Sequence, residues 1–221
     1  MGNLRDLVRW SMERSVPSAI AASGLAVAVL IIGPLMLGRM PTERFLLWNL
    51  ALAWIPFVAA LWVEAMDGTG RGRLAIAAGV VWLLFLPNAP YMVSDLAHFN
   101  SSSPTPWLDL ARLFTFAWAG CLLGISSLRI VHRVIAARRG AVAGWAVVLG
   151  AAVASGIGIA LGRFARVNSW ELLTRPGAVG SEAVRLGGDY RVMAVAMFFT
   201  ALILVMYLSR LERGWVEERR S

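Results

Sequence analysis

Six long apolar runs dominate the pattern of hydrophobic and polar positions along the chain. Each run holds about 20 mostly apolar residues, the length that an α-helix needs to cross the hydrocarbon core of a bilayer. Short polar or arginine-rich stretches separate the runs, and the longest of these, residues 162–191, is too short for a soluble domain. The pattern predicts an all-α polytopic membrane protein, a single domain over residues 1–221 that is a bundle of six transmembrane helices. The predicted spans lie near residues 18–37, 45–63, 74–93, 108–128, 141–161 and 192–208.

A shorter amphipathic pattern precedes the first run. Leu4, Leu7, Val8 and Met12 recur at helical spacing with arginines between them. This spacing predicts an N-terminal amphipathic helix that lies on the membrane surface. The first apolar run begins near Ser18 and is about 20 residues long, so we expect a retained signal-anchor rather than a cleaved signal peptide.

The third apolar run is interrupted by Pro87 and Pro90. Proline lacks a backbone N–H and clashes with the carbonyl four residues earlier, so the helix is predicted to end or kink near Leu86. Irregular backbone at membrane depth is tolerated only where it is buried in protein or lines a cavity. Broken helices of this kind commonly build binding sites.

The composition supports the membrane class. Hydrophobic residues make up 58% of the 221 positions, mean hydropathy is +0.67 and charged residues are 15%, compared with roughly 25% in a soluble domain. The 21 basic residues are all arginines in a chain of net charge +8. They lie mostly in short flanks between apolar runs, which favours lipid head groups over nucleic acid as their partners. The single cysteine, Cys121, excludes an intrachain disulfide.

The arginine distribution predicts the orientation of the chain. In the six-span arrangement, 13 flanking arginines fall on the side of the termini and seven on the opposite side. Arginine-rich connections stay in the cytoplasm, so both termini are expected there, in a multi-pass protein of the bacterial cell membrane. Five of the seven outer arginines lie in the connection 162–191, against this trend.

The fifth run carries small residues at every fourth position: Gly150, Ala154, Gly158 and Gly162. Small residues at this spacing let a second helix approach closely, so the stripe predicts helix packing. Tight packing would hold Arg163 and Arg166 in fixed positions at the outer end of this helix.

Two polar motifs follow directly on apolar runs. Residues 86–91 read LPNAPY and continue to Asp95, His98 and Asp109, and residues 162–171 read GRFARVNSWE. Together these motifs resemble the bacterial membrane-protein family named domain of unknown function 1361, and the similarity covers most of the chain from about residue 45 onward. The resemblance implies a multi-span membrane protein with no assigned activity, and it supplies no mechanism.

The first motif supplies most of the candidate site residues. Polar groups at membrane depth are costly and therefore mark working sites. Asn88 and Tyr91 are candidate ligand-binding residues, although the Asn88 side chain alternatively caps the broken helix. Asp109 is a candidate catalytic group and Arg112 a candidate ligand-binding group. Their i, i+3 spacing also predicts an ion pair between them.

Asp95 and His98 join Asp109 as candidate acid/base groups. One histidine and two carboxylates, with Glu171 as a fourth donor, also have the composition of a divalent metal site. That pattern is weak, so we assign no metal, and the sequence identifies no cofactor.

The second motif offers two guanidiniums, Arg163 and Arg166. At i, i+3 spacing they are able to hold a phosphate or carboxylate bidentately. The alternative is an ion pair with Asp95 or Asp109 that locks two connections together.

Asn168 is a further candidate ligand-binding residue. Its distance from Glu171 instead resembles a capping box that opens a short helix over 170–174, with Pro176 and Gly177 ending it.

Both motifs fall at the outer ends of predicted helices. We therefore predict a small outward-facing pocket beside Asn88, in which Arg163 or Arg166 lies within salt-bridge or one-water reach of Asp95 or Asp109. Three hypotheses of function follow: an enzyme or binding protein for an anionic lipid-linked or head-group ligand, a non-catalytic scaffold whose motifs are structural locks, or a small transporter. The expected partners are the lipid bilayer and this anionic ligand, and the sequence indicates no nucleic acid and identifies no protein partner.

Overall fold

The computed structural model describes residues 4–38, 44–67 and 69–218, and these residues form helices with no β-strand among them. In chain order the elements are α1 (Leu4–Glu13), α2 (Val16–Met36), α3 (Arg44–Met66), α4 (Gly72–Phe85), α5 (Asn88–Ser94), the 3-10 helix η1 (Asp95–His98), α6 (Pro106–Arg139), α7 (Ala141–Phe164), α8 (Glu171–Thr174), α9 (Pro176–Leu186) and α10 (Tyr190–Glu218). Within the described ranges, six segments are long and apolar enough to cross a membrane. The predicted all-α, multi-span class is confirmed.

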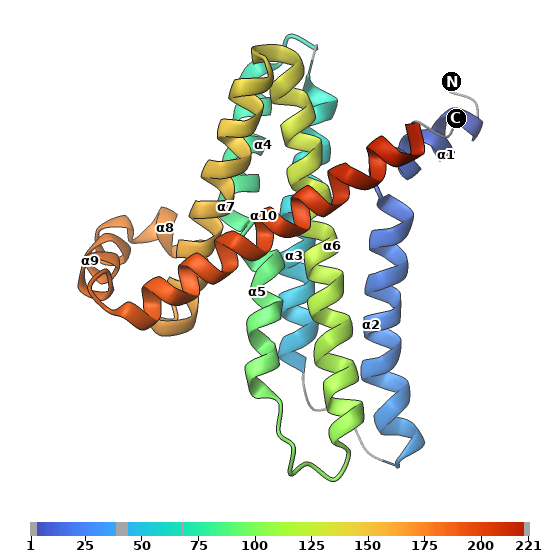
Figure 1. Ribbon diagram of the computed structural model, residues 1–221, viewed down its shortest axis with the longest axis vertical. Coiled ribbons are helices and arrows are strands. Elements are labelled where there is room, and N and C mark those ends of the chain that lie inside the picture. Colours follow the sequence, from blue (N-terminus) through green and yellow to red (C-terminus); the bar gives the residue numbers. More distant parts are fainter. Residues whose placement is uncertain (1–3, 39–43, 68, 219–221) are drawn as a thin grey trace.

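Helix α6 forms the centre of the bundle, with α2, α3, α5 and α7 packed around it (Figure 1). In its most apolar stretch 78% of the residues are buried, compared with 22% in α10. Phe116, Leu123 and Ile130 are at most 1% exposed and follow each other at seven-residue spacing. This spacing keeps them on one helix face, and that face supplies much of the core.

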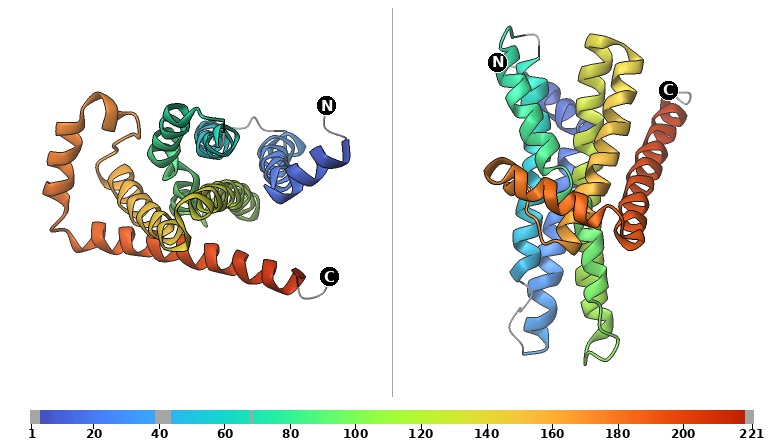
Figure 2. Two further views of the ribbon diagram at one scale, coloured as in Figure 1. Left: turned by 90° about the horizontal axis from the view of Figure 1, so that it is seen from above. Right: turned by 90° about the vertical axis from the view of Figure 1, so that its left-hand side faces the viewer.

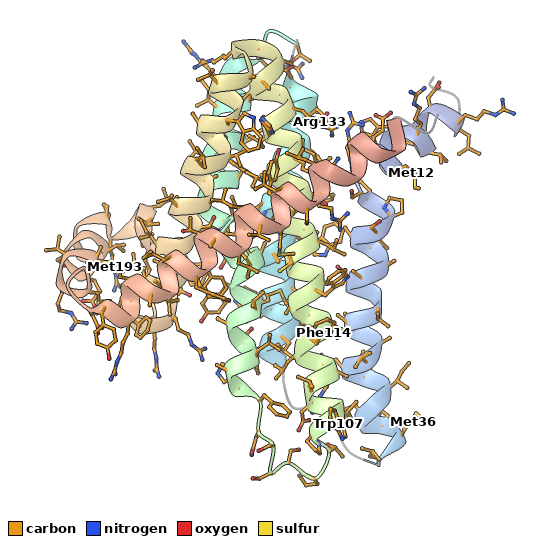
Figure 3. The ribbon with its side chains drawn as sticks, in the orientation of Figure 1. Met12, Met36, Trp107, Phe114, Arg133 and Met193 are labelled. Carbon is orange, nitrogen blue, oxygen red and sulfur yellow. The ribbon has the colours of Figure 1, made fainter. Side chains whose placement is uncertain are left out.

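Large apolar side chains cover the outside of the bundle. Met36, Trp107 and Phe114 lie on its surface, where more than half of each side chain is exposed (Figure 3). Exposed apolar area of this kind is unfavourable in water and suits a hydrocarbon environment.

Helix α4 ends at Phe85 and helix α5 begins at Asn88, so the predicted break near Leu86 is confirmed. Leu86 and Pro87 keep right-handed helical dihedral angles, and the chain therefore continues in roughly the same direction past the break. The two segments, with η1, form the third of the six stretches that are long and apolar enough to cross a membrane.

Three helices differ from the sequence prediction, and one of them, α10, continues to Glu218, ten residues beyond the predicted end at 208. Helix α6 continues eleven residues beyond the predicted end at 128, because arginine is a good helix former and Val131 and Val134 keep the apolar face buried. It stops at Gly140, whose φ of 87° suits glycine. Helix α9 was not predicted: the short helix α8 ends at Thr174, before Pro176 as predicted, and Pro176 then begins α9.

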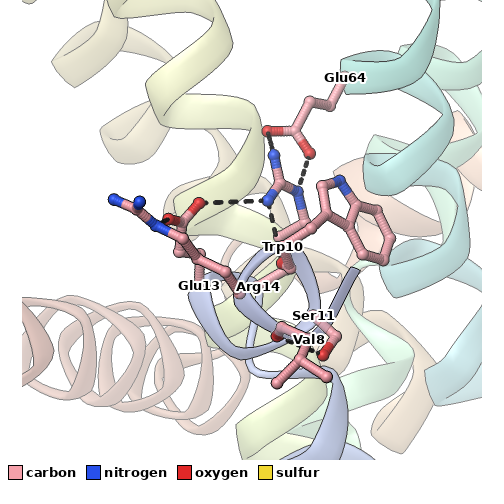
Figure 4. A network of polar contacts seen from close by, with 7 residues as sticks. Val8, Trp10, Ser11, Glu13, Arg14 and Glu64 are labelled. Carbon is pink, nitrogen blue, oxygen red and sulfur yellow. Dashed lines mark hydrogen bonds and ion pairs between the residues drawn. The ribbon is translucent and has the colours of Figure 1, made fainter. Parts of the chain in front are cut away.

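The N-terminal pattern forms helix α1, and its end is tied to α3. The Arg14 guanidinium donates from Nε and Nη2 to the two carboxylate oxygens of Glu64, at 2.5 and 2.9 Å (Figure 4). It also lies 4.7 Å from the centre of the Trp10 ring. The apolar residues Leu4 and Leu7 stay exposed, and the position of α1 on a membrane surface remains a prediction.

Helix α10 crosses the bundle obliquely, over α7 (Figures 1 and 2). Tyr207 is buried where the two helices meet, and its hydroxyl is hydrogen-bonded to His132 Nδ1. Trp145 of α7 packs edge-on against the Tyr207 ring. Lower on α7, Gly156 faces Ala196 and Thr200 so closely that a methyl group would overlap the α10 backbone. This contact seats α10 on α7.

Candidate functional site

The two polar motifs line one pocket of about 600 Å³, called the polar pocket here. It lies where the α4–α5 break, the first half of α3, the end of α7 and the connection to α8 meet. Seven of the nine candidate site residues line it: Asn88, Tyr91, Asp95, His98, Arg163, Arg166 and Asn168. Its volume is within the range of roughly 300–1,000 Å³ typical of small-molecule sites.

Close packing of α7 on the broken helix forms one wall of the polar pocket. A methyl group on Gly158 would lie 2.9 Å from Pro87 Cγ, and one on Gly162 would lie 3.3 Å from the Tyr91 ring. A side chain at Gly158 would displace Pro87, and one at Gly162 would press on the Tyr91 ring, so glycine permits this close approach. The predicted packing role of these two glycines is thus borne out, and they bring the second motif against the first.

Asn88 connects the two motifs directly. Its Nδ2 donates to the Phe85 carbonyl at 3.0 Å and to Ser169 Oγ at 2.8 Å. The first bond satisfies a carbonyl near the end of α4, where the break leaves carbonyls without helical donors. The second joins residues 81 positions apart. The side chain therefore has a clear structural role beside the pocket.

Asp95 is buried, with only 2% of its surface exposed. Its Oδ2 accepts a hydrogen bond from Asn49 Nδ2 of α3 at 2.9 Å, and its Oδ1 lies 3.9 Å from His98 Nδ1. The Arg163 guanidinium also acts on this carboxylate electrostatically. A buried carboxylate needs such partners, because burying a charge without them costs several kcal/mol.

His98 occupies the open side of the polar pocket, with half of its side chain exposed. Its Nδ1 lies 3.2 Å from the Asp95 carbonyl oxygen, and its ring lies 5.8 Å from that of Phe45. A carbonyl oxygen only accepts hydrogen bonds, so Nδ1 carries the proton. Nε2 is then the acceptor of the neutral ring and the atom able to take up a proton.

Arg163 and Arg166 stand at the end of α7. Arg163 lies in its last turn, where the helix dipole favours a cation. Arg166 follows in the left-handed region with φ of 55°, the conformation in which many helices end. Among the described residues neither guanidinium forms a hydrogen bond or ion pair. The polar pocket thus holds two arginines and one buried carboxylate.

Asp109 and Arg112 lie outside the lining of the polar pocket, contrary to the expectation for a single site. They form the predicted ion pair with each other on α6. The first turn of α6 packs on α2, where Leu108 occupies the space beside Gly33, and this contact directs that part of α6 toward α2.

The donors of the weak metal pattern do not come together in the described part of the chain. Asp109 is paired with Arg112, and Glu171 accepts a hydrogen bond from the Asn168 backbone N–H at 2.8 Å. That bond is one half of the predicted capping box; the short helix itself begins at Glu171. The Asn168 side chain remains exposed at the edge of the polar pocket.

Six residues that line the polar pocket were given no role from the sequence: Phe45, Trp48, Asn49, Leu52, Val167 and Ser169. Asn49 is an amide inside an apolar run, and this alone was a signal, because polar groups at that depth usually have a partner. Ser169 lay within a recognised motif without an assigned role. Phe45 and Trp48 resemble ordinary lipid-facing aromatics in sequence.

Comparison with known proteins identifies the family without adding an activity. A family model described as a protein of unknown function, domain of unknown function 1361, matches residues 48–206 and includes both polar motifs. No curated protein and no solved structure matches the chain. The family match spans well over half of the sequence and agrees with the six apolar helices, and this chain therefore belongs to the domain of unknown function 1361 family of membrane proteins.

Proposed function

We propose that this membrane protein binds an anionic ligand in the polar pocket, at the extracytoplasmic face, through Arg163 and Arg166. The observation that carries the proposal is the absence of a direct ion pair for either arginine among the described residues, although both line a pocket with a buried carboxylate. Asp95 offsets only one of the two positive charges. A phosphate or carboxylate held by both guanidiniums neutralises the remainder.

A lipid-linked or head-group anion fits the polar pocket better than a free one. Phe45 and Trp48 stand on the same lining and are 41% and 61% exposed. Aromatic side chains at a membrane boundary pack against lipid while polar groups beside them stay wet. The ligand's charged group then lies at the arginines and its apolar part beside the aromatic residues.

Asp95 and His98 supply acid/base capacity if the bound ligand is also transformed. His98 Nε2 is the proton-accepting atom, and the Asp95 carbonyl keeps the ring in that tautomer. Tyr91, Asn88 and Asn168 complete the polar surface around a bound head group.

Binding to purified variants tests this proposal. Short-chain phosphatidylglycerol and inorganic phosphate are titrated separately into wild type, Arg163→Gln and Arg166→Gln, and the shift in melting temperature is measured. Losing a charged hydrogen-bond partner costs about 1.5–3 kcal/mol, so each variant should bind the lipid roughly tenfold more weakly or worse. Arg175→Gln is the control, because Arg175 is exposed in the same connection and lies outside the lining.

Equal lipid binding by all four proteins would overturn the proposal. A similar shift with inorganic phosphate alone would keep the anion site and reject the lipid-linked source.

The second candidate function is a scaffold in which the motifs are structural locks. The Asn88–Ser169 and Asn49–Asp95 hydrogen bonds favour it, because each joins elements far apart in sequence. In that case variants at the two arginines leave ligand binding unaffected, whereas variants at Asn88 and Ser169 reduce stability.

A further inference from the structure

A second hollow lies between α3, α4, α6 and α7, toward the end of the bundle that carries the α6–α7 turn. This apolar groove has a volume of about 710 Å³, and its walls include Ile76, Leu83, Val131 and Val147. It shares no lining residue with the polar pocket. The groove is therefore a separate feature.

Glycines create the apolar groove. Gly72, Gly79 and Gly150 all line it, and a methyl group built on any of the three meets nothing within 4 Å. Gly156 and Gly158 on the same helix as Gly150 instead touch neighbouring helices. The expected packing role therefore fails for Gly150: it leaves space where an ordinary residue would fill the groove.

One end of the apolar groove is strongly basic. Arg138 and Arg139 line this end, and exposed Arg71 and Arg73 stand on either side of Gly72. Asp67 is the acidic residue of the lining and pairs with Arg138. Four arginines against one aspartate leave an excess of positive charge at the mouth.

The length of the apolar groove matches one leaflet of a bilayer. Along α4 its lining runs from Gly72 to Leu83, and eleven helical steps of 1.5 Å span roughly 16 Å. Half of the roughly 30 Å hydrocarbon core is about 15 Å. A chain that enters at the arginines thus ends near the middle of the membrane.

We propose that the apolar groove holds an acyl chain of an anionic phospholipid whose phosphate lies among Arg71, Arg73, Arg138 and Arg139. The apolar walls exclude a polar ligand, and the charge at the mouth selects an anionic head group over a zwitterionic one. The lipid belongs to the leaflet on the side of the α6–α7 turn. This inference stands independently of the ligand proposed for the polar pocket.

Native mass spectrometry of the full-length protein tests this inference. Detergent-purified protein is incubated with equal amounts of phosphatidylglycerol and phosphatidylcholine, and the lipids retained are identified. The Arg163→Gln/Arg166→Gln protein, which lacks the contact proposed for the polar pocket, is the background for all variants and should retain one phosphatidylglycerol in preference to phosphatidylcholine. A Gly79→Leu/Gly150→Leu variant should lose that lipid because leucine fills the groove, whereas Gly24→Leu, at an exposed glycine with open space elsewhere, should keep it.

Two further arginine variants test the contact with the lipid head group without filling the apolar groove. In that background Arg139→Gln should reduce the preference for phosphatidylglycerol toward parity, whereas Arg175→Gln, at an exposed residue outside both linings, should leave it unchanged. The inference is overturned if this background protein binds both lipids alike, or if the leucine variant retains phosphatidylglycerol as the background protein does. If the leucine variant melts earlier than the background protein, Arg139→Gln decides alone, and an unchanged preference overturns the inference.

Discussion

The Asn88 side chain links the two polar motifs by hydrogen bonds. Replacing Asn88 with alanine leaves the Phe85 carbonyl and Ser169 Oγ without the amide group that donates to both. The site is half-buried, so we expect Asn88→Ala to lower the free energy of unfolding in detergent by about 1 kcal/mol. Ser169→Ala should lower the free energy of unfolding by a smaller amount. The double variant should lower it by less than the sum of the two single variants, because each single variant already breaks the Asn88–Ser169 hydrogen bond.

Asn168→Ala is the control for this cycle, since its exposed side chain forms no hydrogen bond among the described residues. Strict additivity of Asn88→Ala and Ser169→Ala would show that their bond contributes nothing and would weaken the lock hypothesis.

At the same scale, polar residues in apolar surroundings were the part of the polar-pocket lining that the sequence predicted best. Asn88, Asp95 and Arg163 stand out because polar groups are costly at that depth. Their partners were harder to predict: Asn49 meets Asp95 only because α3 and η1 face each other at that height. Asp109 looked equivalent to Asp95, yet the contact of its helical turn with α2 places it elsewhere.

At the scale of the elements, two glycines of α7 have opposite surroundings: Gly156 is packed against α10, and Gly150 faces open space. Alanine substitution at each should therefore have different effects on stability. Gly156→Ala forces a methyl group into the α10 backbone at Ala196, and overpacking of this kind costs about 1–3 kcal/mol. Gly150→Ala adds a methyl group to open space and removes the conformational freedom of glycine, so stability should hold or rise by up to about 1 kcal/mol. Thermal unfolding in one detergent measures both changes. Equal effects of the two variants would contradict the assigned contact between α7 and α10.

The spans themselves were largely predictable because length and hydropathy are local properties. The break at Leu86 followed from two prolines in the same way. Helix α9 was missed because a connection rich in Gly, Pro and Arg masked its apolar face. Val179 and Leu186, at i, i+7 spacing, are buried there and were the available signal.

At the scale of the whole molecule, the oblique course of α10 lies beyond sequence reasoning. Hydropathy predicts that a segment spans the membrane, but the crossing angle depends on which side chains meet the neighbouring helix. Here the close contact at Gly156 and the Tyr207–His132 hydrogen bond hold α10 against α7 and α6. The meeting of the two polar motifs was predictable from the six-span arrangement. The motifs follow the third and fifth predicted spans, so the chain has crossed three and five times from the N-terminus and both motifs fall on the side opposite the termini.

Orientation is the remaining property of the whole molecule, and it decides which side the polar pocket serves. The excess of arginine beside the termini predicts that the connection after η1 and the one containing α9 face outward. Single cysteines at Ser102 and Ser181, both exposed, in a Cys121→Ser background should therefore react with a membrane-impermeant thiol reagent in intact cells. A cysteine at the exposed Ala137, near the α6–α7 turn, should react only after lysis. The reverse pattern would place the polar pocket in the cytoplasm, and labelling of Ser102 and Ser181 from opposite sides would contradict the six-span arrangement.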